Sequence, residues 1–327
     1  MPLAEAWSAG SKKGSGGPSL PRLPQGKRLV AVVAGALALV LVVVGAFHFI
    51  GHGKGKAPSQ KIALALTFTN GQSVSYNFTM SVAGRATAKG IAAPVTGQLT
   101  GTSSWHVNSV DKKGVATITV KTGHVARVTN GRQSSQPPQS FHLRVAADGH
   151  VLAQVGFGTT SGKTDSGPGI PGSDQVTPIL PTGPVAVGEQ WTVTFDQTNP
   201  MGTGVIRYTT ASKLLRFEEV GGVNTAVIWT TADLPIDVSL STRKALAATG
   251  LPAKGLPKGT DPTYWMKGRM VFSQTAWLDI QGRSLVKSNT SGSFDFTVRA
   301  THIDPADQPP GGKLQIQGTI KLEFVRT

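Results

Sequence analysis

From residue 73 onward, hydrophobic and polar side chains alternate one by one in many short stretches. In residues 74–81, Val, Tyr, Phe and Met take turns with Ser, Asn, Thr and Ser. A period of two places successive side chains on opposite faces of a strand, so each stretch predicts a β-strand with one buried face. The alternation recurs at residues 115–120, 141–145, 191–195, 205–210, 225–231, 292–298 and 314–324. Turn residues separate these stretches, so the predicted fold class is mainly β, with antiparallel strands.

The N-terminal part of the chain has a different pattern. Residues 29–50 form an apolar run without a charged side chain, which as a helix would extend about 33 Å and cross a bilayer. Residues 1–28 are rich in Gly, Ser, Pro and Lys, which predicts a disordered tail, and residues 51–61 form a linker. Basic residues before the run favour a cytoplasmic N-terminus and an extracytoplasmic C-terminal domain.

This apolar run has two interpretations. As a signal-anchor it is retained and serves as the single transmembrane helix. As a signal peptide it is cleaved after Ala46, because Val44-Gly45-Ala46 resembles a small-residue cleavage site. The run is longer than the apolar core of most signal peptides, which favours the anchor. Both interpretations predict a domain outside the cytoplasm.

The predicted β-domain contains an internal similarity. Residues 105–118 align with residues 215–228, which suggests a first β half over 62–158 and a second over 190–327, joined by a Gly/Pro-rich connection at 159–189. The halves would form either one sheet or two lobes; alternatively, the match reflects the general likeness of β-meanders. A short helix is predicted at residues 237–250, between a serine N-cap and the stop at Gly250.

Composition narrows the possible chemistry. The chain has no cysteine, which excludes disulfides, thiolate metal sites and cysteine nucleophiles. Its net charge is +15, but residues 1–61 hold eight of the 32 Lys and Arg residues and only one of the 17 acidic residues. The remaining basic residues are scattered, so no nucleic acid is expected as a partner. The bias towards Ala, Gly, Val and Thr fits a bacterial protein from a GC-rich genome, and together with the predicted membrane span it suggests the cell envelope.

Motifs of catalysis and cofactor binding are missing. Residues 151–167 resemble a strand followed by a phosphate-binding loop, but Phe157 stands where the loop needs glycine, so no nucleotide is expected. The seven histidines lack the spacing of zinc hydrolases, and no Gly-x-Ser-x-Gly nucleophile motif occurs. We therefore predict no catalytic residues, no metal and no cofactor; a hydrolase site assembled from distant Ser, His and Asp residues is the least favoured alternative.

One segment carries a resemblance to known proteins. The stretch "ILPTGPVAVGEQWTVTF" at residues 179–195 is similar to a Leu-Pro-x-x-Pro-Val-x-Val-Gly-Asp-x-Trp segment in an uncharacterised family of bacterial extracytoplasmic proteins, often lipoproteins. Glu189 replaces the family's Asp, and the apolar run replaces the lipid anchor. The resemblance implies a β-rich domain at the cell surface without a known activity. Physically, Gly188 suits a positive-φ turn and Trp191 anchors the strand that follows.

Tryptophans suggest where a ligand would bind. Large rings fill cores well, but they also line grooves for apolar ligands. The expected function is a non-enzymatic, membrane-anchored domain that binds a lipid-like ligand or another envelope component. The alternative is a structural or protein-binding module without a small-molecule ligand. The predicted ligand-binding residues come from the strand at 225–231, the predicted helix and the later Trp-containing strand: Val227, Trp229, Leu240, Leu246 and Trp277.

Overall fold

The structure is a computed structural model that describes residues 61–136, 138–155, 178–198, 202–243, 263–301 and 312–327. Fourteen strands within these ranges form one sheet, and all of their pairings are antiparallel. The prediction of a mainly antiparallel β fold is therefore confirmed. No helix in these ranges has the length and apolarity to span a membrane. The predicted span, tail and most of the linker lie outside the described residues.

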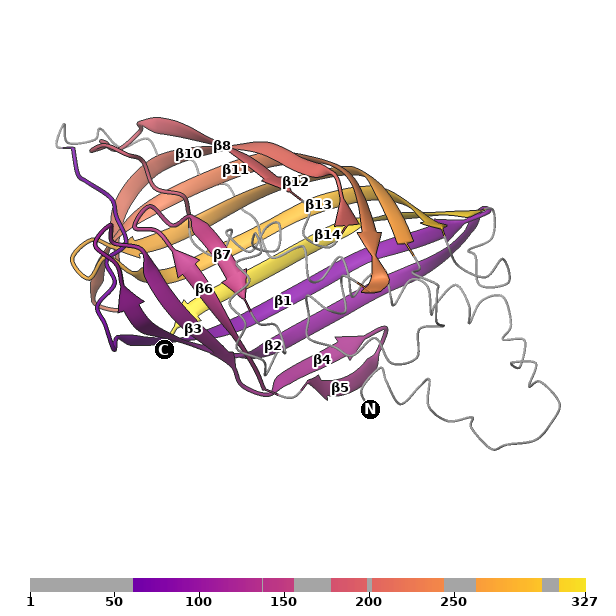
Figure 1. Ribbon diagram of the computed structural model, residues 1–327, viewed down its shortest axis with the longest axis horizontal. Helices are drawn as coiled ribbons and strands as arrows, with labels where there is room; N and C mark the ends of the chain where they lie inside the picture. Colours follow the sequence, from indigo (N-terminus) through magenta and orange to yellow (C-terminus); the bar gives the residue numbers. More distant parts are fainter. Residues whose placement is uncertain (1–60, 137, 156–177, 199–201, 244–262, 302–311) are drawn as a thin grey trace.

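The strands follow the alternating stretches of the sequence but are longer. In chain order they are β1 (Ser73–Ala88), β2 (Ile91–Val110), β3 (Ala116–Thr122), β4 (Val125–Thr129), β5 (Arg132–Gln136), β6 (Gln139–Val145), β7 (Val151–Val155), β8 (Gln190–Thr198), β9 (Gly202–Thr203), β10 (Val205–Val220), β11 (Val223–Ser241), β12 (Thr263–Asp279), β13 (Leu285–Thr301) and β14 (Lys313–Arg326). The longest ones run side by side across the molecule (Figure 1).

Strands from both predicted halves belong to one continuous sheet, in the order β7-β6-β3-β2-β1-β14-β13-β12-β11-β10-β8. The first and last long strands meet in the middle, where β1 pairs with β14 from Tyr76↔Arg326 to Thr87↔Gln315. The aligned segments 105–118 and 215–228 lie in β2–β3 and β10–β11. Internal duplication stays a prediction.

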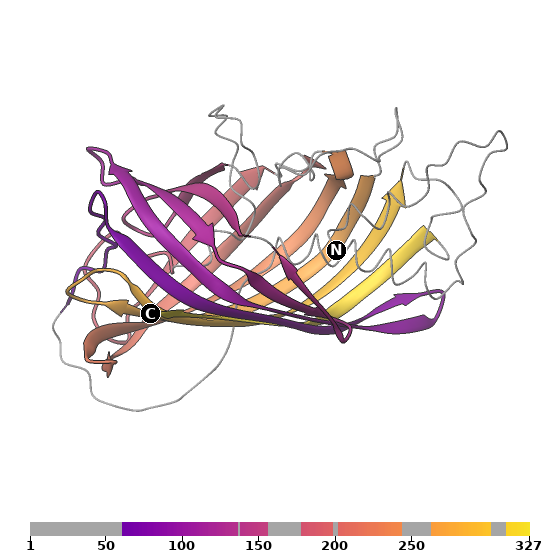
Figure 2. The same cartoon turned by 90° about the horizontal axis from the view of Figure 1, so that it is seen from below.

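The sheet curls into a trough, which Figure 2 shows from below. Side chains from β2, β3 and β6 share an apolar cluster with side chains from β10, β11 and β12, although these two groups of strands are not neighbours in the sheet. Examples are Ile118 on β3 and Ile228 on β11. Such a cluster forms only when the sheet bends back over one face. We call this concave face the inner face and the opposite one the outer face.

One end of the trough is closed by two segments that precede the sheet's two halves. Leu64 and Leu66 from residues 62–68, and Leu180 and Val185 from residues 178–189, join the cluster between the opposing strands. A β-bridge between Ile62 and Val185 ties the two segments together. We call this the closed end.

The segment that resembles the bacterial family takes part in this closure. Gly188 has φ +93°, as its turn requires, and the Glu189 carboxylate accepts a hydrogen bond from the backbone N–H of Ala186 at 3.1 Å. Glu189 also lies 2.8 Å from the ammonium group of Lys61. The indole N–H of Trp191 donates to the carbonyl of Ile179 at 2.9 Å. These contacts give the segment a structural role.

The predicted helix at residues 237–250 is wrong in its first part. Residues 237–241 continue β11 and pair with β12, from Asp237↔Lys267 to Ser241↔Thr263. The period-two alternation of Ile236, Val238 and Leu240 buries one face of an extended strand, and this burial outweighs the local cap signal from serine. Residues 244–250 lie outside the described residues.

Glycines allow the central strands to approach one another unusually closely. A Cβ atom added to Gly268 would lie 1.9 Å from the backbone oxygen of Asp295, and one added to Gly318 would lie 2.5 Å from that of Ala83. Gly84 pairs directly with Gly318. The sheet therefore bends where β1, β14, β13 and β12 cross these glycines. A larger residue at any of them would force the backbone to shift.

Candidate functional site

The inner face of the trough is lined by one continuous apolar cluster. On β11, for example, Leu234, Ile236 and Val238 are each at most 3% exposed and point to this face. Strands β1, β2, β8, β10, β12, β13 and β14 add the other members that come from the sheet, and among the described residues Ile179 is the one member from outside a strand. The cluster thus spans most of the sheet rather than a single pair of strands.

Aromatic and sulfur-containing side chains give this lining its bulk. Phe294 and Phe296 stack with ring centroids 5.7 Å apart, and Phe195 and Tyr208 stack at 4.7 Å. Met270, on β12 between these groups, belongs to the same cluster. Methionine adapts its shape easily, so such a surface suits hydrocarbon chains of variable conformation.

A row of buried polar side chains crosses the inner face towards the closed end. The row consists of Ser212 on β10, Thr230 on β11, Gln274 on β12 and Thr290 on β13. Each of these residues is the direct strand partner of the next one. The hydroxyls of Ser212 and Thr230 are 2.8 Å apart, and Gln274 Nε2 lies 3.4 Å from the Thr290 hydroxyl. All four residues are buried. We call these four residues the polar row.

Ser288 lies beside the polar row and has an unusual environment. It is two residues before Thr290 on β13 and points to the same face. Its strand partners are Ala276 on β12 and Phe324 on β14, both apolar. Ser288 is 0% exposed, and its hydroxyl has no hydrogen-bond partner. A buried hydroxyl without a partner costs free energy, and such groups are rare in folded proteins unless they have a role.

The described inward positions of β11, β12 and β13, and those of β10 from Tyr208 to Leu214, carry no charged side chain. Charged groups of these strands, such as Asp233, Asp237 and Lys267, point to the outer face, where Lys267 and Asp237 lie 3.0 Å apart. An ionic group would therefore enter this part of the trough without a charged partner, which is costly in a medium of low polarity. The inner face suits apolar groups and neutral hydrogen-bonding groups.

The residues predicted from sequence to line a ligand site do not come together. Val227, Trp229 and Trp277 lie on the outer face, where Val227 pairs directly with Trp277. Leu240 lies on the inner face, in the apolar cluster. Leu246 lies outside the described residues. Because side chains of a strand alternate between faces, the even-numbered Leu240 and the odd-numbered Val227 and Trp229 of β11 must point in opposite directions.

Trp277 already has partners on the outer face. Its indole N–H donates to the Glu218 carboxylate, and the Lys287 ammonium lies 5.6 Å from the centre of its ring. Partial burial acts to raise the pKa of Glu218, but hydrogen bonds from Arg216 and Trp277 outweigh it, so this pKa lies below its usual value. These contacts assign Trp277 a role in stabilising the outer surface.

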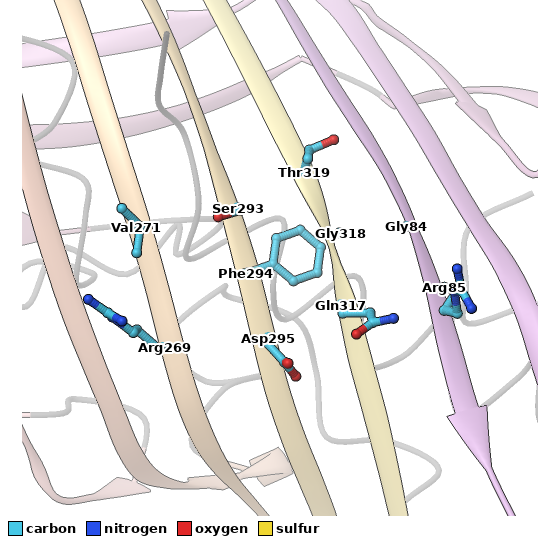
Figure 3. Close-up of a pocket in the computed structure, with 10 residues that line it drawn as sticks. All are labelled: Gly84, Arg85, Arg269, Val271, Ser293, Phe294, Asp295, Gln317, Gly318 and Thr319. Atoms are coloured by element: carbon cyan, nitrogen blue, oxygen red, sulfur yellow. The ribbon is translucent and has the colours of Figure 1, made fainter. Parts of the chain in front are cut away.

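The outer face also has a shallow depression of about 600 Å³, shown in Figure 3. Arg85, Val271 and Asp295 are among the outward side chains around it. Arg269 in its rim forms an ion pair with Asp233, and the hydrogen bond between them lowers the pKa of Asp233. Both side chains of this pair are well exposed, so water competes for them, and the depression offers little to hold a ligand.

A smaller cavity of about 50 Å³ lies near the closed end, between Tyr76, Trp105 and Leu285. It has room for about one or two water molecules. The Tyr76 hydroxyl donates to the carbonyl of Leu285 at 3.2 Å, and burial raises the pKa of Tyr76 to about 12. This cavity is part of the packed closed end.

Within the described ranges, no group of three or more His, Asp or Glu side chains is arranged to hold a metal ion. His150 contacts the inner cluster, with its ring centroid 5.1 Å from that of Phe195. Its Nδ1 atom lies 2.9 Å from the Asp148 carboxylate, and this hydrogen bond lowers the pKa of Asp148. Asp148 also accepts the backbone N–H of His150, so the pair stabilises a turn.

Sequence reasoning missed the polar row and Ser288, although a signal was present. On β11, the even-numbered positions from Ala226 to Leu240 point inward and are apolar, with Thr230 as the polar exception. On β12, Gln274 is the polar exception among the inward positions. On β13, Ser288 and Thr290 are polar residues on the same inward side of the strand as Phe294. A polar residue at an inward position of a strand is the pattern that identifies such a site.

No protein-family model matches the chain, and no curated protein matches its sequence. The resemblance of residues 179–195 to bacterial extracytoplasmic proteins therefore stays a prediction.

Proposed function

We propose that this protein is a membrane-anchored, extracytoplasmic, non-enzymatic domain that binds the hydrocarbon part of a lipid along the inner face of its trough. The observation that carries the proposal is the continuous apolar cluster on the concave side of one sheet. Among the described residues, no second sheet packs against it. Each methylene moved from water to such a surface contributes about 0.8 kcal/mol.

The position of the domain along the chain supports a lipid as the occupant. Ile62, which pairs with Val185 at the closed end, follows the apolar run at residues 29–50 after a short linker. A linker of this length reaches at most about 40 Å when fully extended. If the run is a membrane anchor, the trough stays within reach of bilayer lipids.

A second function is a protein-binding or structural module whose inner face takes no small molecule. The observation in its favour is the completeness of burial: Leu234, Phe296 and Ile316 are each at most 2% exposed. In that case the apolar cluster would be a closed core, and added lipid would find no place in it. The two functions therefore differ in one measurable property, which is whether lipid reaches the inner face.

The test is photolabelling of the full-length protein in membranes with a diacylglycerol that carries a diazirine in one acyl chain. Mass spectrometry would locate the adducts. We expect them at inward positions such as Met270 and Phe296 and not at Val271, which is 42% exposed on the outer face. Labelling restricted to outward positions, or to residues 29–50, would contradict the proposal.

Matched variants sharpen this experiment. Met270→Asn places a polar amide on the inner face and should reduce labelling several-fold, whereas Val271→Asn at the neighbouring outward position should leave it unchanged. Trp277→Ala separates the present proposal from the site predicted by sequence. We expect it to leave labelling unchanged, because Trp277 points outward and contacts Glu218.

A further inference from the structure

We infer that the inner face has a recognition site for an uncharged carbonyl group of the lipid, and that the Ser288 hydroxyl is its hydrogen-bond donor. This inference rests on the proposed function and specifies the ligand class: a neutral lipid ester, such as an acylglycerol. The site lies where the apolar cluster meets the polar row. It would hold the ester group while the hydrocarbon chains follow the apolar lining.

The first argument is the unsatisfied hydroxyl itself. Ser288 is fully buried without a hydrogen-bond partner, so the protein bears a desolvation cost there that an alanine would avoid. A donor kept at such a cost is explained if it pairs with a ligand. The apolar partners Ala276 and Phe324 lower the local polarity, which strengthens a hydrogen bond formed at this position.

The second argument is the chemistry of the neighbours. Thr290, about 7 Å along the same strand, presents another hydroxyl to the inner face. Gln274 lies beside it on β12, and Thr230 follows on β11. These groups are neutral donors and acceptors. The described inward positions of β11, β12 and β13 carry no charge, and Arg326, two residues after Phe324 on β14, forms an ion pair with Asp279 at 3.6 Å. The site therefore selects a neutral group over a phosphate or an amine.

The third argument is the position of the site between two apolar regions. Towards the open part of the trough, Phe294 and Leu322 belong to the large cluster of the inner face. Towards the closed end, Tyr76 and Leu285 form a small apolar cluster with Ala276, the strand partner of Ser288. A group bound at Ser288 therefore lies between the polar row and the small apolar cluster near the closed end, and an ester linkage likewise joins a polar group to hydrocarbon.

The experiment compares two competitors that differ only in their carbonyl groups. Dioctanoylglycerol has two ester carbonyls, and 1,2-di-O-octylglycerol has the same chain number with ether links. Each would compete with the diazirine-bearing diacylglycerol for the full-length protein in membranes. We expect the diester to compete at a concentration about two- to tenfold lower than the diether, as one neutral hydrogen bond provides.

Ser288→Ala decides whether that difference comes from Ser288. We expect it to remove the preference for the diester while the diether competes as before. The matched control is Ser293→Ala, an exposed position on the outer face of the same strand, which should keep the preference. Differences in how the two competitors partition into the membrane cancel in this comparison.

The thermal stability of Ser288→Ala provides a second readout. Removing a buried hydroxyl without a partner should leave the melting temperature unchanged or raise it, so a lost preference would not reflect unfolding. If this variant does not fold, Ser288→Cys keeps a side chain of similar size with a weaker donor and should reduce the preference.

The outcomes separate this inference from the proposed function. If neither competitor reduces labelling of inward positions, the proposed function fails. If both compete but equally well in the wild type, or if Ser288→Ala keeps the preference for the diester, lipid binding stands and the carbonyl site is refuted.

Discussion

Gly268→Ala tests whether the close approach of β12 and β13 produces the trough. Gly268 pairs with Ile236 on one side and Phe296 on the other, in the middle of the inner face. The added methyl carbon would lie 1.9 Å from the backbone oxygen of Asp295 and 2.8 Å from the Cα atom of Phe296. Both contacts involve backbone, so no side-chain rotation relieves them.

The expected loss of stability follows from these distances. Ordinary contacts of a Cβ atom lie at 3.4–4 Å, so the two strands would have to separate by more than 1 Å at this point. Forcing one extra carbon into a packed interior costs about 1–3 kcal/mol, and more where the backbone cannot move. For a domain of this size we expect a melting temperature about 3–10 °C lower, measured by circular dichroism or scanning calorimetry.

Gly183→Ala is the matched control. A Cβ atom at Gly183 would have no heavy atom within 4 Å, and this glycine is not among those with positive φ. The same chemical change should therefore leave the melting temperature nearly unchanged or raise it slightly, because alanine restricts the unfolded chain. Equal melting temperatures for Gly268→Ala and the wild type would refute the close approach of the two strands.

Two further predictions concern pH. Burial raises the pKa of Tyr76 from 10.0 to about 12, so the neutral hydroxyl stabilises the folded state by about 3 kcal/mol up to pH 10, and this contribution is lost as the pH rises towards 12. In urea titrations, the difference in unfolding free energy between the wild type and Tyr76→Phe should shrink across that interval. A difference that stays constant would contradict this prediction. The hydrogen bond from His150 lowers the pKa of Asp148 below 3.8, so Asp148 stabilises the protein above that pH and the contribution is lost as the pH falls through the lowered value. The stability difference between wild type and Asp148→Asn should accordingly narrow below pH 4, and a difference that grows on acidification would count against this pair.

Local sequence signals succeeded where burial repeats along a single strand. The alternation of Val74, Tyr76, Phe78 and Met80 predicted a strand, and these residues lie in β1. The same principle should have extended the strand at 225–231 through Ser241, because Ile236, Val238 and Leu240 continue its period. The serine cap signal favours a helix there, but the structure has a strand over residues 237–241, so the predicted helix is wrong in that part.

The candidate site was not predictable in the same way. The tryptophan content predicts a site at Trp229 and Trp277, but both lie on the outer face. The polar row joins residues from four strands, from Ser212 to Thr290, and no local pattern of the sequence indicates that they are neighbours. Their parity within each strand marked them as inward, but only the register of β10 to β13 aligns them.

The sequence by itself determined which residues form strands and which side chains share a face of each strand, because both depend on a period of two along the chain. Only the tertiary structure decided which face is concave and what lies next to Ser288. Curvature depends on contacts between neighbouring strands, such as the close approach of Gly268 to Asp295, and between distant strands, such as the cluster that joins Ile118 to Ile228. Those contacts depend on the order and register of the whole sheet, which pairs β1 with β14 across nearly the full length of the domain.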